Sequence, residues 1–310
     1  MSSAIVFTEY GGPEVLRLIQ ADQPIPAEGQ VRVRVRAAGL QPADSLLRSG
    51  RFRTFMPACF PQRLGSELAG VVDAVGPGVG QFRFGQEVLG PAAAPSAHAD
   101  HALADASQLV LKPSGLAWSQ AGALSASGQT AATCLSDLSV GKGDTILVHG
   151  AAGGVGSMAV QIAVARGARV IGTASERNHE FLRELGAIPV AYGPGLADRV
   201  REAAGGKFDG TIDAAFDTAG TEDALAASVE LVADRSRIGT VAAAANVEQY
   251  GIRRMSTRRS AAQLQDLVDL TESGRLKVFV QRTFGLDQAR EAYKELDGGH
   301  VHGKLVFLMP

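Results

Sequence analysis

Cysteine is nearly absent from this sequence, which has two cysteines among 310 residues. Cys59 and Cys134 lie far apart and cannot build the disulfide framework of a small secreted domain. Two thiols also cannot supply a cysteine-rich zinc site. We therefore expect both side chains to be small buried hydrophobic groups.

Long hydrophobic runs are absent as well. No apolar segment approaches the roughly 20 residues that a transmembrane helix needs. Residues 1–16 contain neither a basic segment nor a long apolar segment of the kind found in secretory signals. These absences predict a cytoplasmic protein without a membrane partner.

The chain lacks an excess of either charge. Lys and Arg number 30 and Asp and Glu number 32, so the net charge is −2. A broad basic surface is needed to hold a nucleic-acid backbone, so we expect no nucleic-acid partner. The content of 45% hydrophobic and 20% charged residues is typical of a globular protein, and the length suffices for about two domains.

The sequence pattern changes once along the chain. Residues 31–39, VRVRVRAAG, alternate apolar and other side chains as a half-buried strand does, and residues 67–91 continue with short strands broken by Gly and Pro. The first 125 residues therefore predict an antiparallel barrel or sandwich. Beyond them, strand and helix patterns alternate, which predicts an α/β fold with a parallel sheet. The expected strands of this part are residues 145–149, 169–174, 188–192, 210–216 and 237–242.

A glycine-rich turn joins the first of these strands to a helical pattern. It comprises Ala151, Ala152, Gly153, Gly154, Val155 and Gly156. A strand, a tight glycine turn and an immediate helix are the context of a dinucleotide-binding Rossmann fold. Gly153 and Gly154 would let the backbone approach a pyrophosphate, Gly156 would let the helix pack closely, and the helix N-terminus would attract the phosphates. The opening glycine of the strict pattern is replaced by Ala151.

The end of the second strand indicates which dinucleotide binds. An NAD site usually places an acidic residue there to bond the ribose 2′-hydroxyl. Here the strand ends at Ala174 and is followed by Ser175, Glu176 and Arg177. Ser175 and Arg177 would suit the 2′-phosphate of NADPH. Glu176 argues the other way, and Arg177 is alternatively a solvated charge.

Further motifs occur in order along the whole chain. They are YGGPEVL (10–16), AAGLQPADSLLRSG (37–50), LGSELAGVVDAVGPGV (64–79), SASGQTA (125–131), HGAAGGVGSMAVQIA (149–163), ELGA (184–187), FDTAG (216–220), SGRLKV (273–278) and GHVHGKLVF (299–307). With them the sequence resembles the medium-chain dehydrogenase/reductase superfamily, in its zinc-independent quinone oxidoreductase branch. The resemblance implies a GroES-like β-barrel catalytic domain of residues 1–125 and 257–310, and a Rossmann NADP(H)-binding domain of residues 126–256.

The resemblance allows the zinc-ligand positions of the family to be compared with the residues of this sequence. Metal-dependent relatives hold the catalytic zinc with two Cys and one His, and those positions are taken here by Gln41, Ser66 and Ala126. None of the three is a usual zinc ligand. Glu67 persists beside them, but one carboxylate cannot hold the ion. We expect no metal site.

The expected chemistry follows from these missing parts. Without a metal, oxidation of a simple alcohol lacks its electrophile. The Tyr-x-x-x-Lys pair of short-chain reductases is also missing, because no Tyr is followed by Lys four residues later. A quinone or an α,β-unsaturated carbonyl compound already accepts hydride, and hydrogen-bond donors can hold the charge that develops on its oxygen. We therefore expect a small-molecule substrate of this class.

Four residues are candidates for the catalytic site by resemblance. Gln41 replaces an Asn and would donate an amide N–H to substrate or nicotinamide. Phe52 occupies the position of a proposed proton-donating Tyr, so the proton would come from solvent or another residue. Asp44 is either an active-site residue or a helix cap, and Thr130 either lies near the nicotinamide or begins a helix. Reserve candidates are Tyr10, His98, His101 and Tyr250.

Two more residues are candidates for binding the cofactor. Tyr192 occupies a family position beside the 2′-phosphate, unless it only packs at a strand tip. Lys304 occupies a family position near the cleft, unless it is simply solvated. The family also implies a homodimer formed through the Rossmann sheet edge. Two alternatives to a quinone or enone reductase stay open: a dedicated biosynthetic reductase, as in polyketide or other secondary metabolism, and a non-catalytic NADPH-binding protein.

Overall fold

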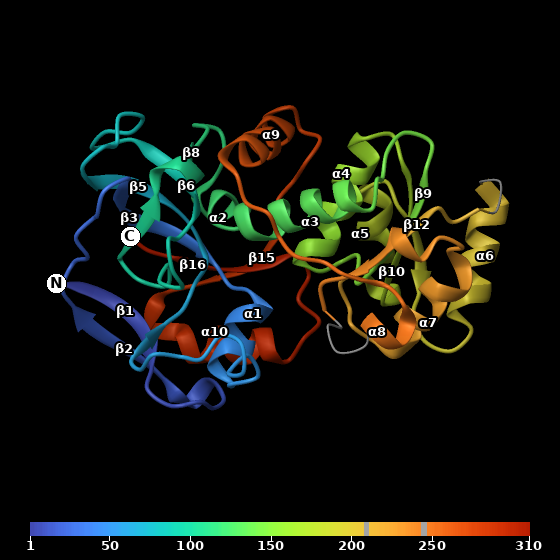
Figure 1. Ribbon diagram of the computed structural model, residues 1–310, viewed down its shortest axis with the longest axis horizontal. Coiled ribbons are helices and arrows are strands. Elements are labelled where there is room, and N and C mark those ends of the chain that lie inside the picture. The colour runs from blue at the N-terminus through green and yellow to red at the C-terminus, as the bar shows by residue number, and fades with distance from the viewer. Residues whose placement is uncertain (208–210, 243–246) are drawn as a thin grey trace. The chain divides into compact units, whose positions relative to one another are not determined.

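The computed structural model describes residues 1–207, 211–242 and 247–310 (Figure 1). Two compact units are formed. Unit 1 contains Met1–Ala126, Arg259–Glu272 and Val278–Pro310, and unit 2 contains Ser127–Arg258 and Ser273–Lys277. Within the described residues, every helix is too short or too polar to cross a membrane.

Unit 1 is built on two sheets. The larger has the order β15-β16-β3-β5-β6-β8, and β7 also pairs with β3. Its strands are β3 (Gln30–Gly39), β5 (Glu67–Val75), β6 (Glu87–Pro91), β7 (His101–Asp105), β8 (Val110–Leu111), β15 (Val280–Phe284) and β16 (Lys304–Leu308). The smaller has the order β2-β1-β4 and consists of β1 (Ser2–Phe7), β2 (Leu16–Ala21) and β4 (Gln62–Arg63).

Alternation along β3 explains how this unit forms its core. Val31, Val33 and Val35 are buried, whereas Arg34 between them is exposed, so the predicted period-two strand is confirmed. Helix α10 (Ala289–Asp297) adds Tyr293 to the same core. The other helices of unit 1 are α1 (Pro42–Arg48), α2 (Trp118–Ala121) and α9 (Ala261–Glu272). The predicted GroES-like fold is confirmed for this part of the chain.

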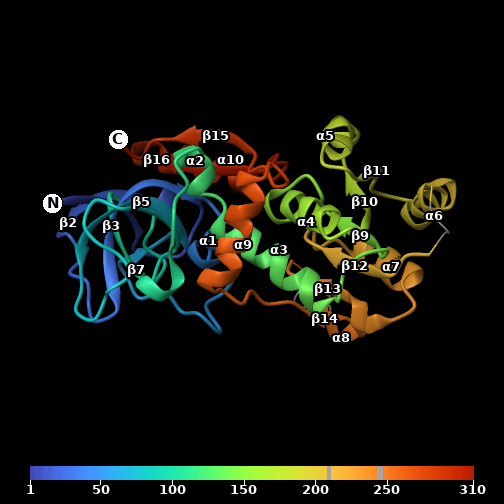
Figure 2. The ribbon, with the colours of Figure 1, turned by 90° about the horizontal axis from the view of Figure 1, so that it is seen from above.

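Unit 2 is built on one parallel sheet with the strand order β11-β10-β9-β12-β13-β14 (Figure 2). Its strands are β9 (Thr145–His149), β10 (Arg169–Ala174), β11 (Ile188–Ala191), β12 (Ala214–Asp217), β13 (Ile238–Thr240) and β14 (Arg253–Arg254). The helices are α3 (Ser125–Asp137), α4 (Gly154–Ala165), α5 (His179–Glu184), α6 (Leu196–Lys207), α7 (Glu222–Leu231) and α8 (Val247–Tyr250). This strand order is that of a Rossmann sheet, in which ligands bind where the order reverses, at the carboxyl ends of the strands.

Three predicted strands of unit 2 are longer than the observed ones. The segment 210–216 was expected as one strand, but β12 starts at Ala214 because the Asp213 carboxylate accepts a hydrogen bond from Thr145 N at 2.7 Å. The strand expected at 237–242 is shorter in the structure, where it is β13. It ends early because Ala242 N donates a hydrogen bond to Thr240 Oγ1 at 3.0 Å, within the chain, and not to a neighbouring strand. The segment 188–192 ends one residue early. Position 210 lies outside the described residues.

Candidate active site and cofactor site

The glycine turn has the geometry that the sequence predicts. Gly150, with φ of +66°, adopts the left-handed conformation that favours glycine. Gly153 N donates to Gly150 O at 3.0 Å and closes the turn before α4. A Cβ on Gly156 would lie 2.8 Å from Ala151 Cα, so only glycine lets the helix begin this close to the turn. Packing by the protein itself therefore explains Gly156.

Gly153 is different, because little of the protein lies where its side chain would be. A Cβ there would lie 3.4 Å from Gly150 O, which is an acceptable contact. Ala151 and Ala152 behind the turn are buried, and Val155 is half-buried. The first amides of a helix that begins at Gly154 have no acceptor within the helix. This part of the turn thus has the space and the donors that a pyrophosphate requires.

Ser175, Arg177 and Tyr192 follow two neighbouring strands. Ala174 at the end of β10 pairs in register with Ala191 at the end of β11. Ser175 and Tyr192 therefore leave the sheet side by side, at the same edge as the glycine turn. Arg177 is exposed, and Tyr192 is 57% exposed. The alternative that Tyr192 only packs at a strand tip does not fit that exposure.

Arg199 on α6 supports this edge of the sheet, and the sequence did not identify it as a candidate. Its guanidinium donates to the carbonyl oxygens of Ala191, Gly193 and Pro194 at 3.0, 3.0 and 2.6 Å. These contacts fix the loop that follows Tyr192. No sequence pattern pointed to Arg199, because its partners are backbone atoms.

A buried carboxylate lies behind the glycine turn. Asp217 at the end of β12 accepts hydrogen bonds from Ala219 N at 2.9 Å, from Gly220 N at 3.0 Å and from Thr240 Oγ1 at 2.6 Å. The next residue, Thr218, donates its hydroxyl to His149 O at 2.7 Å. The end of β12 is thereby tied to the end of β9, where the turn begins.

His149 beside this carboxylate is a neutral core residue. Its Nε2 lies 3.0 Å from Ser228 Oγ and its Nδ1 lies 3.2 Å from Thr173 Oγ1. Ser228 already donates its hydroxyl to Ala224 O at 2.8 Å, so His149 Nε2 carries the proton and Nδ1 accepts from Thr173. Burial lowers the pKa of His149 to about 4, although the negative charge of Asp217 opposes the shift.

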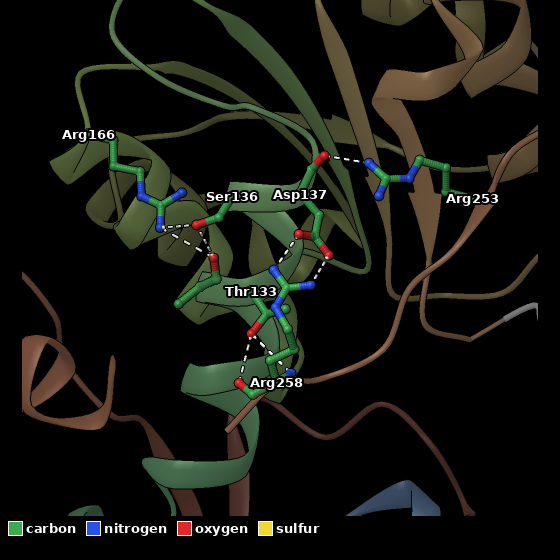
Figure 3. Close-up of polar contacts among 7 residues, drawn as sticks. Thr133, Ser136, Asp137, Arg166, Arg253 and Arg258 are labelled. Atoms are coloured by element: carbon green, nitrogen blue, oxygen red, sulfur yellow. Dashed lines mark hydrogen bonds and ion pairs between the residues drawn. The ribbon is translucent and has the colours of Figure 1, made fainter. Parts of the chain in front are cut away.

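Thr130 lies on α3, where a later segment of the chain packs. Its Oγ1 is 2.7 Å from Thr257 Oγ1. Three residues further along the helix, Thr133 Oγ1 donates to Arg258 O at 3.0 Å. Arg258 forms a two-pronged ion pair with Asp137 and lowers the pKa of that carboxyl, mainly through the hydrogen bonds (Figure 3). Thr130 is thus one of three successive contacts that fasten this segment to α3.

Asp44 caps α1. Its carboxylate accepts from Gln41 N at 2.9 Å and from Gly65 N at 3.2 Å, and the side chain is 4% exposed. Burial raises the pKa of Asp44. Of the two interpretations that the sequence left open, these contacts favour the capping role over direct contact with a substrate.

Gln41, Glu67 and Lys304 form a buried cluster in unit 1. Lys304 Nζ lies 3.0 Å from Glu67 Oε1 and donates to Leu40 O at 3.0 Å. Gln41 Nε2 donates to Glu67 Oε1, and Ala126 N donates to Glu67 Oε2 at 2.7 Å. Lys304 is 3% exposed and Glu67 is 0% exposed. The solvated alternative for Lys304 is therefore wrong, and its predicted contact with the cofactor stays a prediction.

The positions that hold zinc in metal-dependent relatives surround this cluster. Gln41 and Ala126 both donate to Glu67, and Ser66 precedes it. An amide, a hydroxyl and a methyl group do not form the thiolate and imidazole set that binds zinc. Among the described residues, no three His, Cys, Asp or Glu side chains are grouped in a way that could hold a metal ion.

Phe52 belongs to an aromatic surface segment. Its ring is half-buried, packs on the core of unit 1 and lies 4.8 Å from the ring of Phe55, which is 60% exposed. Neither ring can transfer a proton. The nearby Tyr10 hydroxyl accepts from Ala58 N at 2.9 Å, so that phenol has a structural role.

The histidine reserve candidates and one cysteine also find their places. His98 donates through Nε2 to Gly39 O at 3.2 Å and accepts at Nδ1 from the Tyr293 hydroxyl at 3.0 Å; burial lowers its pKa. His101 lies 3.2 Å from Asp73 Oδ2. Both are satisfied barrel residues.

The expectation that Cys59 is buried is wrong, because its loop lies on the surface, whereas Cys134 is buried as expected. The remaining reserve candidate, Tyr250, ends α8.

The sequence was compared with protein families and with related proteins of known function. The family model for the alcohol dehydrogenase GroES-like domain matches residues 27–129, and the model for the zinc-binding dehydrogenase matches residues 185–307. The quinone oxidoreductase of Pseudomonas aeruginosa is 33% identical, with 99% of this chain and 100% of the relative covered. The quinone oxidoreductase of Mus musculus is 30% identical, with 99% and 97% covered.

Solved structures agree with the sequence comparison. The Escherichia coli quinone oxidoreductase complexed with NADPH has a TM-score of 0.87 and 27% identity, with 99% of this chain and 100% of the other covered. An NAD-dependent alcohol dehydrogenase has a TM-score of 0.88 and 30% identity, with 99% and 100% covered. The fold alone therefore does not decide between the two nicotinamide cofactors.

Proposed function

Because this chain belongs to the quinone oxidoreductase branch of the medium-chain dehydrogenase/reductase superfamily, we propose that it reduces quinones or α,β-unsaturated carbonyl compounds with NADPH. The chain is an oxidoreductase of a family that depends on NAD or NADP.

One observation carries the cofactor choice: Ser175 and Tyr192 follow the paired ends of β10 and β11, and Arg177, two residues after Ser175, is exposed. A guanidinium and two hydroxyls suit a 2′-phosphate, which an acidic residue at the strand tip would repel. Glu176 follows Ser175 directly, but it opens a short helical turn and is exposed to solvent. The pyrophosphate would lie at the glycine turn, on the first amides of α4.

The acceptor class follows from the groups that unit 1 offers. NADPH would supply the hydride. The carboxylate of Glu67 already has a lysine, an amide and a backbone N–H as partners, so it is unsuited to accept a substrate proton. Phe52 has no proton to give. A substrate that is electrophilic without a metal, with its proton taken from water, fits these residues.

The direct test is to follow the loss of NADPH absorbance with 1,4-benzoquinone, 9,10-phenanthrenequinone and 2-cyclohexen-1-one as acceptors. We expect oxidation with at least one quinone or enone and slower turnover with NADH. The absence of turnover with every acceptor, despite tight NADPH binding, would instead favour the non-catalytic alternative. Turnover confined to one complex metabolite would favour the dedicated biosynthetic reductase.

Arg177→Ala tests the cofactor choice. Loss of a charge-assisted contact to the 2′-phosphate should weaken NADPH binding by about 10-fold and leave NADH binding unchanged. Arg183→Ala is the matched control, since Arg183 is also an exposed arginine and pairs with Glu180 on α5. Equal weakening of both cofactors by Arg177→Ala would refute the assignment.

Gly153→Ala tests the glycine turn. The added methyl has room in the protein, so the thermal midpoint should change little, but it would occupy space needed by the pyrophosphate and weaken both cofactors. Gly141→Ala, at a glycine with open space around it, is the control. Unchanged cofactor affinity in Gly153→Ala would place the phosphates elsewhere.

We also propose a homodimer formed through the edge strand β14, as the family resemblance suggests. Arg253 and Arg254 are exposed at this edge of the sheet. Sedimentation equilibrium at several protein concentrations would measure the assembly, and a strictly monomeric protein would contradict it.

A further inference from the structure

The orientation of the Gln41 amide is fixed by its neighbours. The side chain is 8% exposed, and its Nε2 donates to Glu67 Oε1. An ionised carboxylate can only accept, so the Nε2 end of the amide must face Glu67 and the Oε1 end must face away. At the N-terminus of α1, Asp44 N donates to the backbone carbonyl oxygen of Gln41 at 3.0 Å, and the Asp44 carboxylate accepts from Gln41 N at 2.9 Å.

Glu67 in turn is held in one position. Lys304 Nζ lies 3.0 Å from its Oε1, and Ala126 N donates to its Oε2 at 2.7 Å. Lys304 is itself tied to Leu40 O at 3.0 Å, directly before Gln41 in the chain. Lys304 and Glu67 form this ion pair in a site with almost no solvent exposure, and because the carboxylate of an ion pair only accepts hydrogen bonds, it fixes one orientation of the amide.

We propose that Glu67 and Lys304 are positioning residues that hold the Gln41 carbonyl Oε1 as a hydrogen-bond acceptor for the bound molecule. The inference rests on the proposed function, because it assumes that cofactor and acceptor bind beside Gln41. It differs from the expectation that Gln41 would donate an amide N–H to substrate or nicotinamide. The site would select a ligand group with an N–H or O–H, which is either the carboxamide of the nicotinamide or a hydroxyl on the acceptor.

Neutralising the ion pair separates this role from simple packing. In Glu67→Gln/Lys304→Met no unpaired charge is buried, so the variant should fold. Gln at position 67 offers both an N–H and a C=O to Gln41, and the Gln41 amide would then occupy either orientation. Gln41→Leu, which has no amide at all, is the reference for complete loss of the contact.

Two pairs of ligands distinguish the source of the donor. In the cofactor arm, fluorescence titration compares NADPH with its 3-acetylpyridine analogue, which has a methyl ketone in place of the carboxamide. In the acceptor arm, steady-state kinetics compare 2-hydroxymethyl-1,4-benzoquinone with its methyl ether. A lost hydrogen bond should appear as a 3- to 10-fold preference of the unaltered protein for the donor-bearing ligand, on the order of one hydrogen bond.

The expected result is a preference in one arm that disappears in both Gln41→Leu and Glu67→Gln/Lys304→Met, with no further loss when the variants are combined. Two results would overturn the proposal: no preference in either arm in the unaltered protein, or a preference that the folded Glu67→Gln/Lys304→Met variant retains. The cofactor arm needs only binding. Tight NADPH binding without turnover would therefore refute the reductase while the positioning role is still decided by titration.

Discussion

Glu67 in unit 1 and Asp217 in unit 2 are both fully buried carboxylates, yet they are stabilised in different ways. Glu67 has the ammonium group of Lys304 as a partner, together with one amide and one backbone N–H. Among the described residues, the hydrogen-bond donors to Asp217 are two backbone N–H groups and the hydroxyl of Thr240, without a cation among them.

The difference lies in where the donors come from. Ala219 and Gly220 follow Asp217 in the same turn, so a short local segment supplies most of the stabilisation. The partners of Glu67 come from positions 41, 126 and 304, which only the folded barrel brings together. A carboxylate in a turn can be satisfied by backbone amides, whereas one in the middle of a barrel sheet needs side chains from elsewhere.

Removal of the cation should have the largest effect. Lys304→Met leaves Glu67 buried and unpaired, so we expect the free energy of unfolding to fall by about 3–5 kcal/mol. Urea denaturation measures it, and Lys277→Met, at an exposed lysine, should stay within about 0.5 kcal/mol. A loss below about 1 kcal/mol for Lys304→Met would mean that Glu67 does not depend on its cation.

The pH dependence tests whether Asp217 truly lacks a cation. His149 pairs in register with Asp217 and could become a cation, but burial lowers its pKa to about 4, below the ordinary 6.5. Between these values the unfolded chain binds a proton that the folded chain does not, so stability is lost as pH falls from 6.5 to 4, by roughly 3 kcal/mol.

Urea denaturation at pH 7 and pH 4.5 gives this slope. His149→Gln should reduce it, whereas His300→Gln, at an exposed histidine, should not. If His149 were protonated to serve Asp217, its pKa would be raised and acidification towards pH 6 would stabilise the protein instead.

The hydrogen bond from the Thr240 hydroxyl should contribute a smaller part of the free energy of unfolding. Thr240→Val removes the 2.6 Å hydrogen bond to Asp217 Oδ2 while it keeps the shape of the side chain. We expect a loss of about 2 kcal/mol, because the partner is a charged and buried group. Thr240→Ser keeps the hydroxyl and should lose less than half as much; equal losses would show that packing, and not the hydrogen bond, matters at this position.

The smallest effect is expected from neutralising Asp217 itself. Asp217→Asn keeps an acceptor for Ala219 N and Gly220 N and leaves no partner charge behind, so the loss should be about 1 kcal/mol. Glu67→Gln should cost several times more, because Lys304 would remain buried without its partner. Similar losses for the two isosteric changes in urea denaturation would remove the contrast between the units.

Local chemistry explains which features the sequence predicted. The strand 145–149, the turn at Gly153 and the helix after it depend on neighbouring residues, so their order could be inferred directly. The NADPH assignment used Ser175 and Arg177, which directly follow a strand. The strand at 210–216 was overestimated, because Asp213 hydrogen-bonds through its side chain where a regular strand had been expected.

Long-range pairing explains what the sequence could not give. Nothing in the motif around Lys304 indicates that its ammonium lies on Glu67, 237 positions away in the chain. In the part of the chain that the structure describes, Arg199 hydrogen-bonds to backbone carbonyls, which carry no side-chain signature. Asp44 was left between a cap and an active-site group, and the hydrogen bond from Gly65 N needed the folded barrel to be seen.

The most direct measurement is NADPH oxidation with 1,4-benzoquinone by protein that has been dialysed against EDTA and analysed for metals. We expect the rate to survive and zinc to stay well below one ion per chain, because the Lys304 ammonium lies on Leu40 O and Glu67, directly beside Gln41 and Ser66 in the chain. An activity that EDTA abolishes and added zinc restores would contradict it.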